Sequence, residues 1–194
     1  MGMEMTDGRV QRGERSRAAI VSALFELVGD GVLTPTAQQV AEVAGVGIRS
    51  VFRHFADMDS LYAEMDARLR SHAEPILREA GPGGALRDRA EALVRRRVRL
   101  FERVAPYKRS ANVQRWRSSF LRGRHSRLVR ELRADLLRVL PELERWPEDA
   151  FEALELLTSF EAWDRLRSDQ RLSRERAEAA LVRGVLALVE SASR

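Results

Sequence analysis

The sequence predicts an all-α protein with about nine helices among its 194 residues. No alternation of apolar and polar residues is long enough to indicate a strand. Segments that contain Gly or Pro divide the chain into helical lengths. Within these lengths apolar residues recur with the period of an amphipathic helix, as at Ile20, Ala23, Leu24, Leu27 and Val28.

Three predicted helices lie close together in the N-terminal part of the chain. The first carries the apolar stripe above and ends at Gly29-Asp30-Gly31. The second runs from Ala37 to Ala44 with Thr36 as its N-cap, and the third runs from Ile48 to Phe55. The segment Gly45-Val46-Gly47 joins the second and third as a tight turn.

Six further helices are expected. The fourth begins at Asp57 or Asp59, runs towards Glu79 and ends before Gly81-Pro82-Gly83-Gly84. The others are expected at residues 85–105, about 107–117, 119–140, 148–168 and 174–191, with Pro106, Pro141 and Pro147 between them. We therefore expect a three-helix domain at residues 1–58 and a larger helical bundle at residues 59–194, joined by the fourth helix without a flexible linker.

The composition excludes several classes of protein. Because the sequence has no Cys, it can form no disulfide, thiolate metal site or Cys nucleophile, which favours a reducing, cytoplasmic setting. The polar N-terminal segment lacks the apolar stretch of a signal peptide. No apolar run approaches the roughly 18 residues of a membrane span, so no membrane partner is expected.

The formal net charge of +5 is unevenly distributed along the chain. Residues 1–60 carry 6 Arg and 8 acidic residues, a net charge of −2. Residues 61–145 have a net charge of +10, and residues 146–194 have a net charge of −3. A basic excess is typical of proteins that bind nucleic acid, but this one lies outside the N-terminal domain. Nucleic-acid binding must therefore be argued from individual residues.

Residues 36–55 have the pattern of a helix-turn-helix. Val40, Val46 and Val51 supply a small core between two crossing helices. Ala41 is small where the helices approach, and Gly45 supplies the positive φ that the turn needs.

The third predicted helix has two different faces. Val51 and Phe55 are expected to point into the core. The opposite face carries polar residues that are expected to face a groove of DNA: Arg49, Ser50, Arg53 and His54.

Over residues 15–62 the chain resembles the TetR/AcrR family of bacterial transcriptional regulators. Residues 156–167, then Leu172-Ser173 and a final apolar helix, are similar to the last two helices of this family. The resemblance implies an all-helical homodimer with a ligand-binding C-terminal domain, usually a repressor, and a near-palindromic double-stranded DNA operator. The residues that match the family's motif are Thr36, Val40, Ala41, Ala44, Gly45, Val46, Val51, Phe52, His54, Phe55 and Leu61.

Three positions depart from the usual pattern of the family. Gly47 stands where Ser or a similar cap is common, Phe52 where Tyr is common, and Met58 where Lys is common. Each departure removes a polar group of a kind that typically contacts phosphate. We expect the N-terminal arginines to supply part of the missing contacts, namely Arg9, Arg12, Arg15 and Arg17.

The predicted DNA-binding residues have different roles. Arg49 and Ser50 are expected to read base edges, because guanidinium groups suit guanine O6 and N7. Gln38 adds a contact, Ile48 packs on a thymine methyl, and Thr36 and His54 bind the DNA backbone. Phe52 has two alternatives, core packing or contact with a sugar or phosphate. The full predicted set is Thr36, Gln38, Gly47, Ile48, Arg49, Ser50, Phe52, Arg53 and His54.

The last two predicted helices are apolar on more sides than one neighbour requires. Gly184 lies within the final helix, where glycine costs about 1 kcal/mol relative to alanine and therefore indicates close approach of another helix. Both helices could be buried within one subunit. The resemblance implies instead that they pair with their symmetry mates in a four-helix bundle.

Helical phase gives two candidates for a ligand pocket. Arg97 projects from the middle of the apolar arc of helix 85–105, and His125 lies in the middle of the arc of helix 119–140. Arg95, Arg96 and Arg99 lie outside the first arc and are expected to be solvated. A charge on an apolar face must be paired or must line a wet cavity.

Two interpretations of these candidates are open. In the first, Arg97 forms an internal ion pair and His125 is a hydrogen-bonded core residue; the candidate partners of Arg97 are Asp135, Glu161 and Asp164. In the second, Arg97 and His125 orient an anionic or carbonyl-bearing ligand in a pocket that is also lined by Phe101, Trp116 and Phe120.

No pattern in the sequence indicates an enzyme, a metal site or a cofactor. The only histidines, His54, His72 and His125, are too scattered for a metal site, and the glycine-rich segment 81–84 lacks the Lys-Ser/Thr of a P-loop. The predicted function is a ligand-responsive DNA-binding regulator in which ligand moves the fourth helix and separates the two recognition helices. The alternative is a helical ligand-binding or partner-binding module that has lost specific DNA binding. A third possibility, an enzyme with the same helical fold, would require turnover of a small molecule, and no residue pattern in the sequence predicts it.

Overall fold

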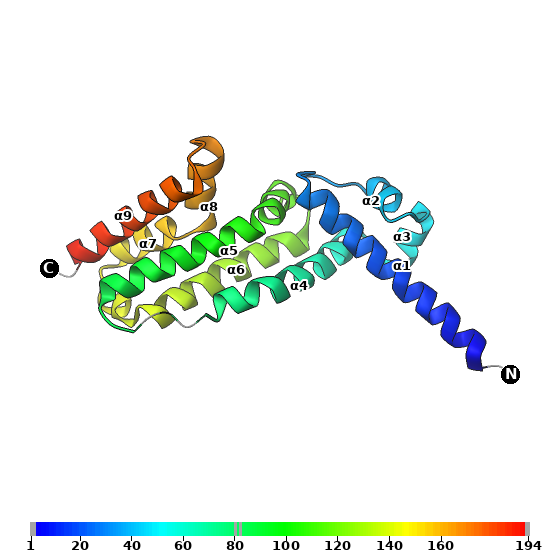
Figure 1. Ribbon diagram of the computed structural model, residues 1–194, viewed down its shortest axis with the longest axis horizontal. Helices are drawn as coiled ribbons and strands as arrows, with labels where there is room; N and C mark the ends of the chain where they lie inside the picture. Colours follow the sequence, from blue (N-terminus) through cyan, green and yellow to red (C-terminus); the bar gives the residue numbers. More distant parts are fainter. Residues whose placement is uncertain (1–2, 80, 82, 193–194) are drawn as a thin grey trace. The chain divides into compact units, whose positions relative to one another are not determined.

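The structure, a computed structural model, describes residues 3–79, 81 and 83–192. These residues form nine α-helices and no strand, so the predicted all-α fold is confirmed (Figure 1). A 3-10 turn, η1 (Pro141–Arg145), precedes α7, and a π-helical turn, η2 (Arg165–Asp169), follows α8. The helices are α1 (Met3–Gly29), α2 (Ala37–Val43), α3 (Ile48–His54), α4 (Met58–Leu77), α5 (Leu86–Gln114), α6 (Ser119–Val139), α7 (Glu148–Leu157), α8 (Phe160–Asp164) and α9 (Arg174–Ala192).

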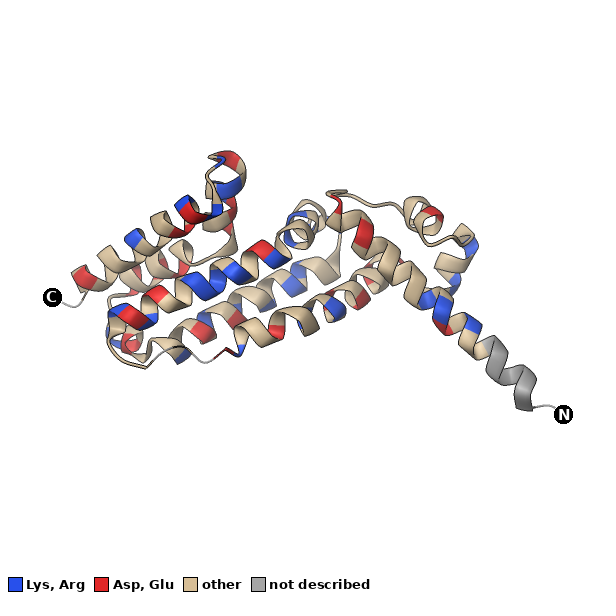
Figure 2. Ribbon diagram, viewed as in Figure 1, with Lys and Arg blue, Asp and Glu red and all other residues tan. Residues whose placement is uncertain are grey.

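The basic residues of segment 61–145 recur along α5 and α6 (Figure 2). Several of them pair with carboxylates inside the protein: Arg89 with Glu142, Arg96 with Asp135, Arg124 with Asp66, and Arg133 with Glu152. Much of this basic segment therefore serves the packing of its own helices.

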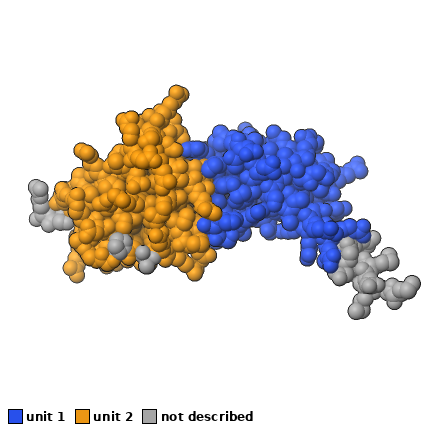
Figure 3. Space-filling model, in the orientation of Figure 1, with its two compact units in different colours: residues 1–72, 106–124 blue, residues 73–105, 125–194 orange. Residues whose placement is uncertain are grey.

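The chain forms two compact units (Figure 3). Unit 1 comprises Met1–His72 and Pro106–Arg124, and unit 2 comprises Ala73–Ala105 and His125–Arg194. Because α4 places Leu61, Tyr62 and Met65 in the core of unit 1, the packing of this unit extends beyond residue 58. The division of the chain by function stays a prediction. It assigns DNA binding to residues 1–58 and ligand binding and dimerisation to residues 59–194.

Unit 1 is built around one apolar cluster to which each of its first four helices contributes. Ile20 and Leu24 come from α1, Val40 from α2, Val51 from α3 and Leu61 from α4, and all five are almost fully buried. A buried side chain of this size stabilises the folded state by about 1.5–3 kcal/mol. This cluster therefore holds the helix-turn-helix against α1 and α4.

Unit 2 has a separate apolar core. The rings of Phe101, Phe160 and Trp163 meet there, with the Phe101 and Phe160 centroids 5.7 Å apart in an edge-to-face arrangement. In α9, a Cβ atom added at Gly184 would lie 3.3 Å from Cδ1 of Leu157. The absence of a side chain at residue 184 thus allows α7 and α9 to pack closely within the unit.

Two of the predicted helix boundaries are wrong. The predicted helices 85–105 and 107–117 are the single helix α5, which contains Pro106. Ala105 and Ser110, on either side of this proline, are buried, so packing outweighs the one backbone hydrogen bond that a proline removes. The predicted helix 148–168 is instead divided at Thr158, because the Ser159 side chain accepts a hydrogen bond from Ala162 N and caps a new helix, α8.

The start of α4 distinguishes between the two predicted caps. Oδ1 of Asp57 accepts a hydrogen bond from Ser60 N at 2.8 Å, and the Ser60 hydroxyl donates to the Asp57 carbonyl. Asp57 therefore caps α4, and Asp59 lies within its first turn.

Candidate DNA-binding surface and buried arginine cluster

The helix-turn-helix begins with a capping box at α2. The Thr36 hydroxyl accepts from Gln39 N at 3.2 Å, and the Gln39 side chain accepts from Thr36 N at 2.9 Å. These two bonds satisfy backbone donors that the first turn of a helix leaves unpaired. The predicted N-cap is confirmed, and the Thr36 hydroxyl, although exposed, is already engaged within the protein.

The turn between α2 and α3 is a Schellman motif around Gly45. Gly45 has a φ of 64°, its N–H donates to Glu42 O at 3.1 Å, and Val46 N–H donates to Ala41 O at 3.0 Å. A positive φ is unstrained only for glycine, which explains why this residue type stands here. The motif directs the chain from α2 into α3.

The apolar face of α3 is buried as predicted, whereas of the four predicted polar residues Arg49 and Arg53 are exposed and Ser50 and His54 are half-buried. Val51 and Phe55 are buried in the core of unit 1, whereas Ile48, Arg49 and Arg53 are exposed. Phe52 is 52% exposed, so of its two alternatives core packing is wrong. The exposed face of α3 therefore combines two guanidinium groups with two apolar side chains, which is suitable chemistry for base edges, thymine methyl groups and the sugar–phosphate backbone.

Three of the predicted DNA-binding residues, Gln38, Ser50 and Arg53, already have local hydrogen-bond partners. Gln38 Nε2 donates to Glu42 at 2.8 Å, and an Arg53 Nη donates to Ser50 Oγ at 3.3 Å. Gly47 is the N-cap of α3 and makes no side-chain capping bond, as expected from the glycine at this position. Met58 is the first residue of α4 and is half-buried.

His54 is less accessible than the sequence suggested. Its Nε2 atom is buried and has no hydrogen-bond partner among the described residues. Burial lowers the pKa of His54 below its ordinary value, and the nearby positive charges of Arg53 and Arg17 lower it further. The imidazole is therefore neutral at neutral pH, and backbone binding by this side chain stays a prediction.

The N-terminal arginines divide into two groups. Arg12 and Arg15 are exposed on α1, and the side chain of Arg9 lies outside the part of the chain whose side chains are described. Arg17 contacts residues of unit 1 instead: it donates to the carbonyl of His54 at 3.2 Å and pairs with Glu64. This role could not be predicted from the sequence, because both partners are distant along the chain.

Arg97 has the internal partners of the first interpretation. It is 2% exposed, and it donates to Thr158 O at 2.9 Å, Thr158 Oγ1 at 2.8 Å and Leu132 O at 2.6 Å. One of its Nη atoms lies 3.7 Å from Asp135, the first of the three predicted partners. Burial lowers the pKa of Arg97 to about 10, although Asp135 raises it, so the guanidinium remains charged at neutral pH.

The prediction that Arg96 is solvated is wrong. This residue is 5% exposed and donates to Asp135 at 2.6 Å. Its other Nη donates to the carbonyl of Leu77, the last residue of α4, at 3.3 Å and to that of Glu79, just after the helix, at 3.0 Å. The prediction of solvation holds for Arg95 and Arg99, which are exposed. Arg96, Arg97 and Asp135 therefore form a buried cluster, called the arginine cluster below.

The other predicted ligand residues are divided between the two units. Phe101 is a core residue of unit 2, and His125 is a half-buried residue of the same unit. Trp116 and Phe120 belong to unit 1, where Trp116 is 75% exposed and Phe120 packs against the apolar cluster. Whether these residues bind a ligand stays a prediction.

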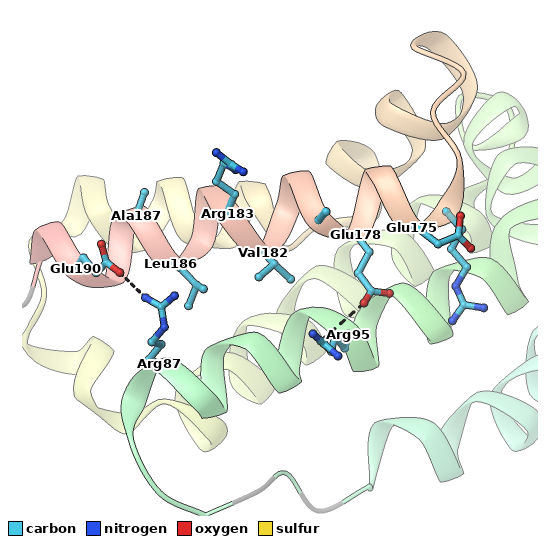
Figure 4. A pocket seen from close by; sticks show the side chains of 11 residues that line it. Arg87, Arg95, Glu175, Glu178, Val182, Arg183, Leu186, Ala187 and Glu190 are labelled. Carbon is cyan, nitrogen blue, oxygen red and sulfur yellow. Dashed lines mark hydrogen bonds and ion pairs between the residues drawn. The ribbon is translucent and has the colours of Figure 1, made fainter.

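A groove of about 760 Å³ runs between α5 and α9 in unit 2 (Figure 4). Val182 and Leu186 supply apolar surface, and the ion pairs Arg87–Glu190 and Arg95–Glu178 cross it. None of the five predicted ligand residues lines this groove.

Neither a metal centre nor a membrane span was found in the described part of the chain. No group of three or more His, Asp or Glu residues there could hold a metal ion. No helix in that part combines the length and the apolar character needed to cross a bilayer.

These observations define a class of protein: an all-helical chain with a helix-turn-helix that exposes arginines and a second, separately packed helical unit. A transcriptional regulator from Rhodococcus sp. Rha1 has a similar structure, with a TM-score of 0.69 and 23% identity over 94% of this chain and 98% of that one. A TetR transcriptional regulator from Rhodococcus sp. RHA1 gives a TM-score of 0.56 and 21% identity over 91% and 99%.

The chain therefore has the fold of TetR-type transcriptional regulators. No protein-family model matches the sequence, and no curated protein matches it. Since one fold can serve several functions, the function has to be argued from the site.

Proposed function

We propose that this protein is a homodimeric, DNA-binding transcriptional regulator of the cytoplasm, a repressor that a small-molecule effector releases from a near-palindromic operator. The observation that carries the proposal is the exposed face of α3, with Arg49 and Arg53 beside Ile48 and Phe52 on a helix held by the core of unit 1. A helix presented in this way suits the major groove of DNA.

The DNA-binding part is tested by selection from a library of random double-stranded DNA with the full-length protein. We expect one enriched, near-palindromic sequence. Arg49→Ala should weaken binding to it by about tenfold and relax the preference at one position per half-site. Arg130→Ala, which removes an exposed arginine from α6, is the matched control and should retain the preference.

The opposite outcome would favour the alternative function. If no sequence is enriched, the protein is a helical ligand-binding or partner-binding module without specific DNA recognition. The net charge of −2 over residues 1–60 and the lack of a side-chain cap at Gly47 are the observations in its favour. Wild-type affinity and preference in Arg49→Ala would remove that residue from the recognition set.

For the effector, the proposed site lies in unit 2 at Arg97. In support, the Nε atom of this buried guanidinium has no hydrogen-bond partner among the described residues, and it could donate to a carboxylate or carbonyl oxygen. Of the other predicted residues, Phe101 and His125 belong to the same unit, whereas Trp116 and Phe120 belong to unit 1 and are not part of this proposed site. If the effector and DNA favour different conformations, each must weaken the binding of the other by the same factor.

A panel of small carboxylates, titrated into the protein while its tryptophan fluorescence is followed, tests this site. Saturable binding should be lost in Arg97→Lys and weakened in His125→Ala. The same titration with the selected duplex present should give weaker binding. If both variants respond like the wild type, the proposed effector site is wrong.

A further inference from the structure

Arg17 on α1 contacts three other parts of unit 1 with one guanidinium group. One Nη donates to the carbonyl of His54, the last residue of α3, at 3.2 Å. The other Nη pairs with Glu64 of α4, and Cζ lies 4.5 Å from the centre of the buried Phe55 ring. The side chain thus joins α1 to the C-terminal end of the recognition helix and to α4.

The contact with His54 has a clear electrostatic basis. The last carbonyls of a helix have no partners within that helix, and they carry the negative end of its dipole. A guanidinium at this end therefore satisfies one carbonyl and neutralises partial charge. The α1 residue one turn earlier, Gly13, also packs here, because a Cβ atom added to it would lie 3.9 Å from Cε1 of His54.

This geometry leaves Arg17 poorly placed for DNA. Its side chain is 40% exposed, and both Nη atoms are directed at partners within unit 1. A planar guanidinium can hold two acceptors and stack on a ring at once, whereas the single ammonium of lysine cannot.

We propose that Arg17 is a positioning residue for DNA recognition, which fixes the orientation of α3 relative to α1 and α4 and makes no contact with phosphate. This inference rests on the proposed function for its effect on DNA binding. The connection through Glu64 also means that a displacement of α4 would be transmitted to the recognition helix by this side chain.

Salt dependence separates positioning from phosphate contact. The logarithm of the binding constant falls with the logarithm of the salt concentration, with a slope of about −0.9 for each phosphate neutralised. Arg17→Gln should weaken binding to the selected duplex by about tenfold, leave binding to a scrambled duplex unchanged and keep the same slope. A slope reduced by about one would overturn the proposal.

Two variants test the geometry. Arg17→Lys should not restore affinity, because the charge alone is insufficient. Glu64→Gln should weaken specific binding in the same direction, and its effect should not add to that of Arg17→Gln, as expected for residues that act through one contact. Full rescue by lysine, or simple additivity, would contradict the proposal.

A measurement without DNA keeps this inference separate from the proposed function. Amide hydrogen exchange of residues 51–55 should accelerate in Arg17→Gln and in Glu64→Gln, since α3 loses its connection to α1 and α4. Arg15→Gln makes the same charge change on the exposed side of α1 and should leave this exchange unchanged. If selection enriches no DNA sequence, the proposed function fails while the exchange result still stands. Unchanged exchange in both variants would overturn the role of Arg17.

Discussion

Asp135 lies within ion-pair distance of two buried arginines. It accepts from Arg96 at 2.6 Å, lies 3.7 Å from Arg97 and also pairs with the exposed Arg138. A guanidinium group is a permanent charge in proteins, and a buried charge without a counterion is costly. The stability of unit 2 therefore depends on this carboxylate.

We predict that Asp135→Asn lowers the free energy of unfolding by about 3–5 kcal/mol, because it removes the carboxylate that pairs with two buried guanidinium groups. Urea denaturation followed by circular dichroism measures the change. Glu152→Gln is the control. Glu152 accepts two hydrogen bonds of 2.8 Å from Arg133 on an exposed face, so this substitution should lower the free energy of unfolding much less. Equal effects of the two substitutions would contradict a special role for burial.

His54 gives a prediction about pH. Burial lowers its pKa in the folded protein, with further lowering by Arg53 and Arg17, whereas the unfolded chain has the ordinary value of 6.5. Between these two values the unfolded chain binds more protons, so stability is lost as the pH falls through this window. NMR titration of the His54 ring should give a midpoint below 6.5. The fall in unfolding free energy below that pH should be shallower in His54→Gln; an identical slope would contradict the prediction.

At the residue scale, the burial of a side chain follows from the sequence more readily than the identity of its partners. Helical phase correctly placed Arg97 on a buried face and named Asp135 among three possible partners. It failed for Arg96, which lies outside the apolar arc of α5 but is covered by the carbonyls at the end of α4. The same limitation applies to Arg17, because its partners come from two other helices.

Helix α5 continues through Pro106, and this defines a prediction at the scale of the element. A proline in a helix removes the bond from its own nitrogen to the carbonyl four residues earlier, here Glu102. Pro106→Ala should restore this bond and raise the free energy of unfolding by about 1–3 kcal/mol. Thermal unfolding measures the change, and Pro141→Ala, at the start of the short turn η1, should have a smaller effect. A loss of stability in Pro106→Ala would mean that the proline ring packs better than the alanine.

The short helices α2 and α3 could be predicted closely, because local chemistry determines their ends. Thr36 forms the capping box and Gly45 the turn, and both signals lie within a few residues of the helices they limit. The break between α7 and α8 could not be predicted in this way. Besides the local cap at Ser159, the break includes Thr158, whose carbonyl and hydroxyl both accept from Arg97 of the distant helix α5.

At the scale of the whole molecule, the net charge of +5 is a poor guide to the DNA-binding surface. The basic excess lies on α5 and α6, where many arginines pair with carboxylates of their own unit (Figure 2). The exposed arginines of α3 are few, and their value comes from their position on a recognition helix. We therefore expect salt to weaken specific and non-specific binding with a modest slope, set by the small number of phosphates contacted.

In the proposed dimer, we expect the outward face of α7 and α9 in unit 2 to form the subunit interface. Leu156 of α7 is 60% exposed, and Ala180 of α9 is also exposed. A large apolar side chain that is this exposed, on a helix packed against α9, is suited to burial by another helix. A second copy of the chain would bury this leucine against its own α7 and α9 through a two-fold axis.

Leu156→Glu should convert the dimer to a monomer, because it would bury two unpaired carboxylates in the symmetric interface. Sedimentation equilibrium gives the mass directly, and binding to the selected duplex should weaken because a monomer occupies one half-site. Val113→Glu is the matched control, since Val113 is a similarly exposed aliphatic residue of unit 1 and its replacement should leave the dimer intact. If Leu156→Glu is still a dimer, the subunit interface lies elsewhere. If the wild type is a monomer at micromolar concentration, the proposed dimer does not form. In either case recognition of a near-palindromic operator would need a different explanation.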